Sequence, residues 1–219
     1  GVTVIMPDKR CVASVDVRGG APGTRETELL NPSNSINTID AIVISGGSVF
    51  GLEASSSVTS WLSKQKRGID VRGAIIPIVP SAIIFDFPIN PKRNWNDANP
   101  FSSLGIKACS NTVKNFELGN AGAGIGATAG KIKGGLGSAS FITNEGWQIG
   151  ALSVVNPYGE TVIPGTNKFW AGGIEVKAEF GGYGSASLDT INLDYRASGS
   201  IGGNTTISVV ATNIILTKA

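Results

Sequence analysis

The stretch at residues 202–213 constrains the fold of this chain more than any other. It consists of a flexible joint formed by glycines, followed by a stiff β-strand. Gly202 and Gly203 can adopt backbone angles that other residues avoid. From Thr205 to Val210 nearly every residue is β-branched, which favours a pleated, half-buried strand. The pattern places the hydroxyl of Thr205 where a loop meets a strand, a suitable position for a nucleophile. An ordinary turn entering a strand has the same pattern, so both interpretations stay open here.

The composition favours one well-packed domain and argues against charged partners. The chain has 219 residues, of which 41% are hydrophobic, 16% are charged and 30 are glycines. Few charges and many glycines indicate buried, closely packed backbone, because disordered chains are rich in charge. The net charge of +2 offers no electrostatic case for nucleic acid or an anionic membrane. Since no apolar run approaches the roughly 18 residues that span a bilayer, we expect neither partner.

The chain contains no histidine. This excludes Ser-His-Asp and Cys-His catalysis and the common zinc sites with histidine ligands, and we expect no metal or other cofactor. A nucleophilic hydrolase of this composition must take its base from lysine, a carboxylate or a free terminal amine. Cys11 and Cys109 are isolated, so we expect two small core residues in a reduced, cytoplasmic chain.

The first half of the chain alternates short strands with helices. Val2–Ile5 and residues 11–17 are β-prone runs that we expect to form a hairpin. Residues 41–44 are typical of a buried strand that passes through Gly46 and Gly47 into a helix over residues 49–66. The exposed amides of such a junction can bind an anion or an oxyanion, and a tight strand-to-helix turn explains the same residues equally well.

Residues 119–131 are rich in glycine but do not encode a nucleotide site. A phosphate-binding loop needs Ser or Thr after its lysine, where this chain has Ile132, and a dinucleotide site needs an acidic residue about 20 positions later. The small residues would instead let a strand pass close under other backbone. Lys131 then either projects into that crowded space or is solvated at the end of a strand.

The second half is expected to be dominated by strands. A weaker helix is predicted over residues 101–116, followed by strands at 138–143 and 147–155. Residues 160–163 are expected to pair back on the second of these strands as a hairpin. The irregular stretch at 164–203 is typical of a partly flexible linker of roughly 40 residues, a length that is often functional.

Several blocks together resemble one family. They are residues 16–27, 45–54, 122–140, 155–157 and 203–207, in order along nearly the whole chain. Together they resemble the self-processing L-aminopeptidase/D-esterase family, which includes the β-peptidyl aminopeptidases and the nylon-oligomer hydrolase. The resemblance implies an α+β fold, a four-layer α-β-β-α sandwich that resembles the N-terminal-nucleophile hydrolases with different connectivity.

The resemblance also implies the site. The precursor would cut itself between Asn204 and Thr205, giving a large-subunit part at 1–204 and the start of a small subunit at 205–219, with Thr205 as nucleophile. Lys131 and Asn156 match the lysine and asparagine of the nylon-hydrolase branch. Phe85 and Ser48 are the expected substrate-binding residues; some relatives carry Tyr where this chain has Phe85. Phe50 and Trp95 are further candidates for the pocket wall.

The expected protein is therefore one hydrolase domain at 1–219, truncated at both ends, that acts on a small peptide, amide or ester and forms a homo-oligomer. Relatives continue past the nucleophile strand with further site residues that this chain lacks. Two other hypotheses stay open. The same threonine would serve an acyltransferase that passes the acyl group to an amine, and the chain would otherwise be an inactive or structural remnant of the family.

Overall fold

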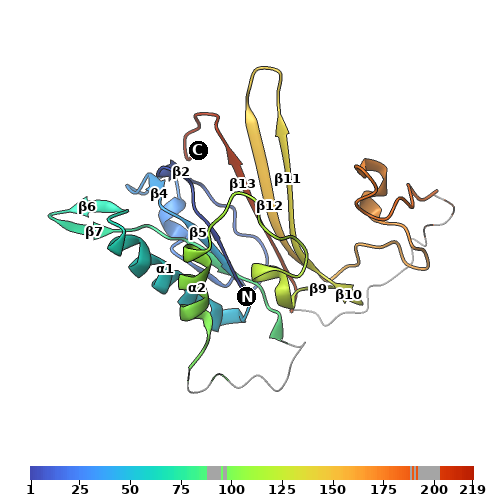
Figure 1. Cartoon of the computed structure of the whole chain (residues 1–219), viewed down its shortest axis with the longest axis horizontal. Coiled ribbons are helices and arrows are strands. Elements are labelled where there is room, and N and C mark those ends of the chain that lie inside the picture. Colours follow the sequence, from blue (N-terminus) through green and yellow to red (C-terminus); the bar gives the residue numbers. More distant parts are fainter. Residues whose placement is uncertain (88–94, 96–97, 188, 190, 192–202) are drawn as a thin grey trace.

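The computed structural model describes residues 1–87, 95, 98–187, 189, 191 and 203–219. Figure 1 shows two sheets with helices packed over one of them. The first sheet has the strand order β1-β5-β8-β3. These strands are β1 (Val2–Ile5), β5 (Ile42–Ser45), β8 (Ser81–Ile83) and β3 (Thr24–Arg25). β5 and β8 run parallel, as expected for strands joined through a helix, and the other pairs are antiparallel.

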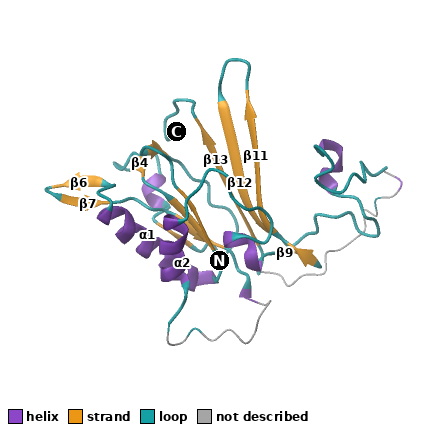
Figure 2. Ribbon diagram, viewed as in Figure 1, coloured by secondary structure: helices purple, strands orange, loops and turns teal. Residues whose placement is uncertain are grey.

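Helices α1 (Glu53–Lys64) and α2 (Phe101–Ser110) pack against each other and against this first sheet (Figure 2). Val43 of β5 is buried among Val58, Leu62 and Phe101 from the two helices. Ile44, the next residue, is buried in a different cluster on the opposite face. Because successive side chains of a strand point to opposite faces, β5 is covered on both sides, which explains its continuous apolar run.

The second sheet is an antiparallel meander with the order β11-β12-β13. Its strands are β11 (Gly135–Ile142), β12 (Gln148–Asn156) and β13 (Thr205–Thr212). Val154 of β12 is buried against Ile44, and the half-buried Ile207 and Val209 of β13 pack on the same cluster. The two sheets therefore share an apolar interface, and the sequence-based expectation of an α+β chain is confirmed. α1 and α2 both lie on the first sheet, and the fourth layer stays a prediction.

Short elements connect these layers. The two-stranded pairs are β2 (Cys11–Val12) with β4 (Thr38–Ile39), β6 (Ile69–Val71) with β7 (Ala74–Ile76), and β9 (Thr128–Ala129) with β10 (Ile132–Lys133). The 3-10 helices are η1 (Glu28–Leu30), η2 (Ser48–Leu52), η4 (Gly122–Gly126) and η5 (Trp170–Ile174). Within the described ranges no helix is both long enough and apolar enough to cross a bilayer.

Both hairpins expected from local pattern are wrong. β1 pairs with β5, and β2 pairs with β4, because β1 gains far more apolar contact beside the buried β5 than beside the exposed Cys11 and Val12. Residues 160–163 do not return to β12, whose two edges are occupied by β11 and β13. Val162 forms a bridge with Phe169 instead.

The two cysteines differ in their surroundings. Cys109 is a buried core residue, as predicted, whereas Cys11 is exposed on the short strand β2, so that prediction is wrong. The Cys11 thiol is still partly shielded from water, which raises its pKa; Arg67 lowers the pKa and Asp40 raises it, with a net upward shift.

The linker expected at residues 164–203 contains the 3-10 helix η5, and residues 188, 190 and 192–202 lie outside the described residues. Gly202 of the predicted joint is among these. The helix predicted over residues 49–66 begins as the 3-10 turn Ser48–Leu52 and continues as α1, and the helix predicted over residues 101–116 ends at Ser110.

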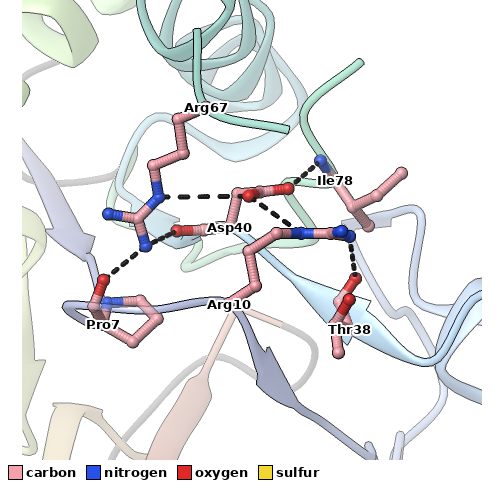
Figure 3. A network of polar contacts seen from close by, with 6 residues as sticks. All are labelled: Pro7, Arg10, Thr38, Asp40, Arg67 and Ile78. Carbon is pink, nitrogen blue, oxygen red and sulfur yellow. Dashed lines mark hydrogen bonds and ion pairs between the residues drawn. The ribbon is translucent and has the colours of Figure 1, made fainter. Parts of the chain in front are cut away.

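A buried ion cluster ties the first sheet to the end of α1 (Figure 3). Asp40 is fully buried, and its Oδ1 lies 3.2 Å from Nε of Arg10 and 3.9 Å from Nε of Arg67. Its Oδ2 accepts the Ile78 N–H at 2.9 Å. Arg67 also donates to the carbonyls of Asp40 and Pro7. The cluster joins residues 7–10, the bend between β4 and β5, and the chain after α1.

Candidate active site

Asn156 and Thr205 lie next to each other at one end of the second sheet. β12 and β13 lie side by side (Figure 1). β12 ends at Asn156, β13 begins at Thr205, and the two residues are direct partners in the antiparallel register. Partners of this kind have Cα atoms about 4.5–5.5 Å apart. The sheet thus brings together two residues that are 49 positions apart in the sequence (205 − 156). Thr205 is half-buried, so packing does not enclose it.

The side chain of Asn156 is held in one orientation. It is 2% exposed, its Oδ1 accepts the Thr128 N–H at 2.9 Å, and its Nδ2 donates to the Phe85 carbonyl at 3.0 Å. Nδ2 also lies 3.5 Å from the carbonyl oxygen of Gly203. Because an amide oxygen only accepts and an amide nitrogen only donates, these partners fix which end points where. Nδ2, the donor end, points to the carbonyl of Gly203, the residue before Asn204.

Thr205 and Asn156 point into the space between the two sheets. Side chains alternate along a strand, and Ile207 and Val209 of β13 pack on the inter-sheet cluster with Val154. Thr205 and Asn156 fall on the same face by this alternation. The exposed Thr206 lies on the opposite face.

Lys131 is exposed in the turn between β9 and β10. Of the two positions expected from sequence, a crowded interior or a solvated strand end, the structure shows the second. Lys131 is connected to Asn156 through the strand β9. β9 begins at Thr128, and the Thr128 N–H donates a hydrogen bond to the Asn156 side chain. The structure therefore brings Asn156 and Thr205 together and places Lys131 at the far end of a short strand.

The three aromatic candidates for a pocket wall belong to one aromatic cluster. The ring of Phe87 lies 5.9 Å from that of Phe85, 6.0 Å from Phe50 and 5.2 Å from Trp95. Trp95 also contacts the buried Phe101, with ring centroids 5.2 Å apart. Phe85 and Phe50 are 37% and 44% exposed. Since the carbonyl of Phe85 holds Asn156, this aromatic cluster adjoins the amide.

The Gly46–Ser48 turn is a tight strand-to-helix connection, and its amides are occupied. The Gly46 N–H donates to the Gly1 carbonyl at 2.9 Å, the Gly47 N–H to Asp86 Oδ1 at 2.7 Å, and the Ser48 N–H to the Ile84 carbonyl at 3.2 Å. The alternative expectation of an anion or oxyanion site at these amides is wrong for this reason. Gly47 and Ser48 have φ of 83° and 54°, and Ser48 is half-buried.

Asp86 was missed by the sequence prediction. It follows Phe85, is 1% exposed, and binds the Gly47 amide. A signal was present, because this carboxylate is the single charged residue in the apolar run at 82–87. Burying a charge without partners is costly, so a lone acidic residue inside an apolar run indicates a specific role.

A pocket of about 510 Å³ lies elsewhere, lined by Val155 together with Phe169, Trp170 and Phe180 from the segment after β12. Val155 precedes Asn156 on the strand, so the two side chains point to opposite faces. The residues that line this pocket do not include Asn156.

Comparison with known proteins identifies the family. The model of peptidase family S58 matches residues 1–219. An uncharacterized aminopeptidase of Mycobacterium tuberculosis is 39% identical over 100% of this chain and 63% of its own length. A 6-aminohexanoate-oligomer endohydrolase of Paenarthrobacter ureafaciens is 31% identical over 98% of this chain and 58% of its own length. The chain thus spans about three fifths of these curated relatives.

Two solved structures share the fold. A Burkholderia sp. beta-aminopeptidase superposes with a TM-score of 0.59 at 20% identity, over 74% of this chain and 46% of that one. A protein of Pyrococcus horikoshii superposes with a TM-score of 0.62 at 21% identity, over 96% of this chain and 52% of that one. The resemblance found in the sequence is confirmed, and the chain belongs to peptidase family S58.

Proposed function

We propose that this protein is a self-processing aminopeptidase or amidase whose nucleophile is Thr205. The observation that carries the proposal is the pairing of Thr205 with Asn156, whose donor group points to the backbone just before the Asn204–Thr205 bond. The half-buried position of Thr205 at a strand start is also suitable, because β13 fixes one side of the residue and leaves the other accessible.

Self-cleavage begins with attack of the Thr205 hydroxyl on the carbonyl carbon of Asn204. A new C–O bond forms, the C–N bond of the peptide breaks, and the hydroxyl proton leaves with the amine of Thr205. The product is an ester between Asn204 and the side chain of Thr205, which water hydrolyses. The two products are residues 1–204 and a chain that begins at Thr205.

Substrate cleavage then uses the amine that self-cleavage exposes. A terminal amine has a pKa of about 7.7–8.0, so near neutral pH it can accept the hydroxyl proton of Thr205. This supplies a base in a chain without histidine. Asn156 donates to the developing oxyanion, a contribution worth about 3–4 kcal/mol of barrier in comparable sites. Lys131 is the third proposed residue; it is exposed beyond the end of β9, so in this proposal its positive charge acts on the amine and the hydroxyl from outside the Asn156–Thr205 pair.

The substrate in this proposal is a small peptide, amide or ester that loses its N-terminal residue. The aromatic cluster beside Asn156 offers an apolar wall, with Phe85 and Ser48 at the substrate-binding positions. Relatives named aminopeptidase and 6-aminohexanoate-oligomer endohydrolase support amide bonds as the target class. The whole protein is proposed as a cytoplasmic homo-oligomer with a four-layer α-β-β-α sandwich.

Replacement of Thr205 tests the proposal. Thr205→Ala should give a single uncut chain without hydrolysis of amide or ester substrates, because no hydroxyl remains to attack. Thr205→Ser should be cut and active, since it retains the hydroxyl. Thr206→Ala is the matched control, because its side chain lies on the opposite face of β13. Denaturing mass spectrometry and substrate assays report the outcome, and a cut or active Thr205→Ala protein would refute the assignment.

A further inference from the structure

Asp86 is a buried carboxylate that the proposed mechanism does not use. It is 1% exposed, and its Oδ1 accepts the Gly47 N–H at 2.7 Å. Its Oδ2 is buried and has no hydrogen-bond partner among the residues that the structure describes. An unpaired buried oxygen of this kind is unfavourable for folding, which raises the question of what the residue does for the site.

Two glycines from distant segments enclose this carboxylate. A Cβ added to Gly46 would lie 2.4 Å from Asp86 Oδ2, and a Cβ added to Gly126 would lie 2.1 Å from it. Real Cβ atoms do not approach an oxygen this closely, so only glycine fits either position while Asp86 stays in place. Gly46 precedes the turn into η2, and Gly126 ends η4. Asp86 is thus the point at which these two glycine-rich segments meet.

The two shorter of the three hydrogen bonds of the Asn156 side chain involve backbone next to this meeting point. Its Nδ2 donates to the carbonyl of Phe85, the residue before Asp86. Its Oδ1 accepts from Thr128, two residues after Gly126. A shift of Asp86 would therefore move one partner of the amide directly and the other through the short link from Gly126.

We propose that Asp86 is a positioning residue for the reaction: it sets the distance between the Phe85 carbonyl and the Thr128 amide and so holds Asn156 in its donating orientation. Its effect on the reaction rests on the proposed function, whereas its effect on the position of Asn156 does not. Asp86 does not contact the substrate in this scheme. It acts through Asn156.

Amide hydrogen exchange measured by NMR tests the positioning role without any assay of activity. In Asp86→Ala, exchange at the Gly47 and Thr128 amides should accelerate at least tenfold, because the first loses its acceptor and the second loses a fixed partner. In Asp86→Asn both rates should stay within threefold of the parent protein, since the amide oxygen replaces the acceptor for Gly47. Unchanged exchange at Thr128 in a folded Asp86→Ala protein would overturn the proposal.

The rate of self-cleavage gives the second readout. Asp86→Ala should slow it at least tenfold, and Asp86→Asn should restore it to within threefold of the parent rate. Asp40→Ala is the matched control, because Asp40 is also a buried aspartate that accepts a backbone N–H, that of Ile78. Its folded fraction should cleave at the parent rate. An equal loss in Asp40→Ala would mean that general destabilisation is the cause, and would also overturn the proposal.

A glycine variant covers the case in which Asp86→Ala does not fold. Gly126→Ala displaces the carboxylate without removing it, and Gly137→Ala is its control, because no atom lies within 4 Å of an added Cβ there. Gly126→Ala should reproduce the exchange change at Thr128, and Gly137→Ala should not. If neither Asp86→Ala nor Gly126→Ala folds while the controls do, Asp86 is a structural residue only and the proposal fails.

The two proposals fail separately. A parent protein that never cleaves itself would contradict the proposed function, while the exchange rates would still decide the role of Asp86. A parent protein that cleaves itself, with a folded Asp86→Ala variant that cleaves equally fast, would leave the proposed function intact and refute the positioning role.

Discussion

The side-chain amide of Asn156 is held in one orientation near the proposed cleavage point. Its Oδ1 accepts a hydrogen bond at 2.9 Å, its Nδ2 donates at 3.0 Å and lies 3.5 Å from the Gly203 carbonyl, and the residue is 2% exposed. Asn156→Ala should lower kcat for substrate and the rate of self-cleavage by about 10²–10³-fold, equivalent to 3–4 kcal/mol of barrier. Asn120→Ala is the control, because Asn120 is an exposed asparagine that donates to the Gly134 carbonyl. Equal rates in the two variants would contradict the role of Asn156.

The thiol of Cys109 gives a pH-dependent prediction. Burial raises its pKa from 9.0 to about 11, so the folded protein keeps the thiol proton at a pH where the unfolded chain loses it. The stability supplied by this group is therefore full below pH 9 and lost as the pH rises towards 11. Urea unfolding at pH 8 and pH 10.5 should show a larger loss for the parent protein than for Cys109→Ala. Equal losses would contradict the prediction.

At the residue scale, the candidate residues at the ends of strands could be predicted from the sequence, whereas the buried carboxylate of the site could not. The position of Thr205 at a strand start follows from the joint and the β-branched run, and the choice of Asn156 follows from the resemblance of residues 155–157 to the family, while the roles of both residues stay proposals. Asp86 could not be found in this way, because its role depends on contacts with Gly46 and Gly126, which are distant in the sequence. Contacts between residues that are distant in the sequence produce no local sequence pattern from which they could be predicted.

At the element scale, the Asp40 cluster ties the chain after α1 to the paired strands β2 and β4. The ion pairs join Asp40 to Arg10 and Arg67, whose side chains are 30% and 22% exposed. Asp40→Ala should reduce the free energy of unfolding by about 3–5 kcal/mol, since it leaves two arginines without their partner and the Ile78 N–H without its acceptor.

Urea denaturation of Asp40→Ala beside Asp16→Ala checks this value. Asp16 and Arg18 form an ion pair at 2.8 Å, but their side chains are 69% and 85% exposed, and pairs of this kind contribute about 0–1 kcal/mol. A loss in Asp40→Ala no larger than that in Asp16→Ala would show that the cluster in Figure 3 does not tie the segments together.

Helices and strands with a clear hydrophobic pattern could be predicted from the sequence, whereas the neighbours with which the strands pair often could not. The strand at Thr205, the buried strand before Gly46 and the helix after it were all expected and are present. The expected hairpin from β1 was wrong because strand pairing is decided by burial across the whole sheet, and β5 buries both faces. The local sequence pattern predicts that a strand forms, and contacts across the fold decide which strand pairs with it.

At the scale of the whole molecule, the segment after the proposed cleavage point is attached at two places. β13 pairs with β12 along Thr205–Thr212. Near the other end of the segment, Lys218 is 9% exposed and donates to the carbonyls of Leu29, Asn34 and Ile36 at 2.8–3.1 Å. Cutting the Asn204–Thr205 bond removes neither attachment, so residues 205–219 should stay bound to residues 1–204.

The most direct test of the central claim is the mass of the purified protein under denaturing conditions, together with the N-terminal sequence of each species. We expect two chains, residues 1–204 and a chain that begins Thr-Thr-Ile-Ser, which elute together under native conditions and separate in denaturant. A single intact mass, or a cut at any other bond, would contradict the assignment of Thr205 as the nucleophile.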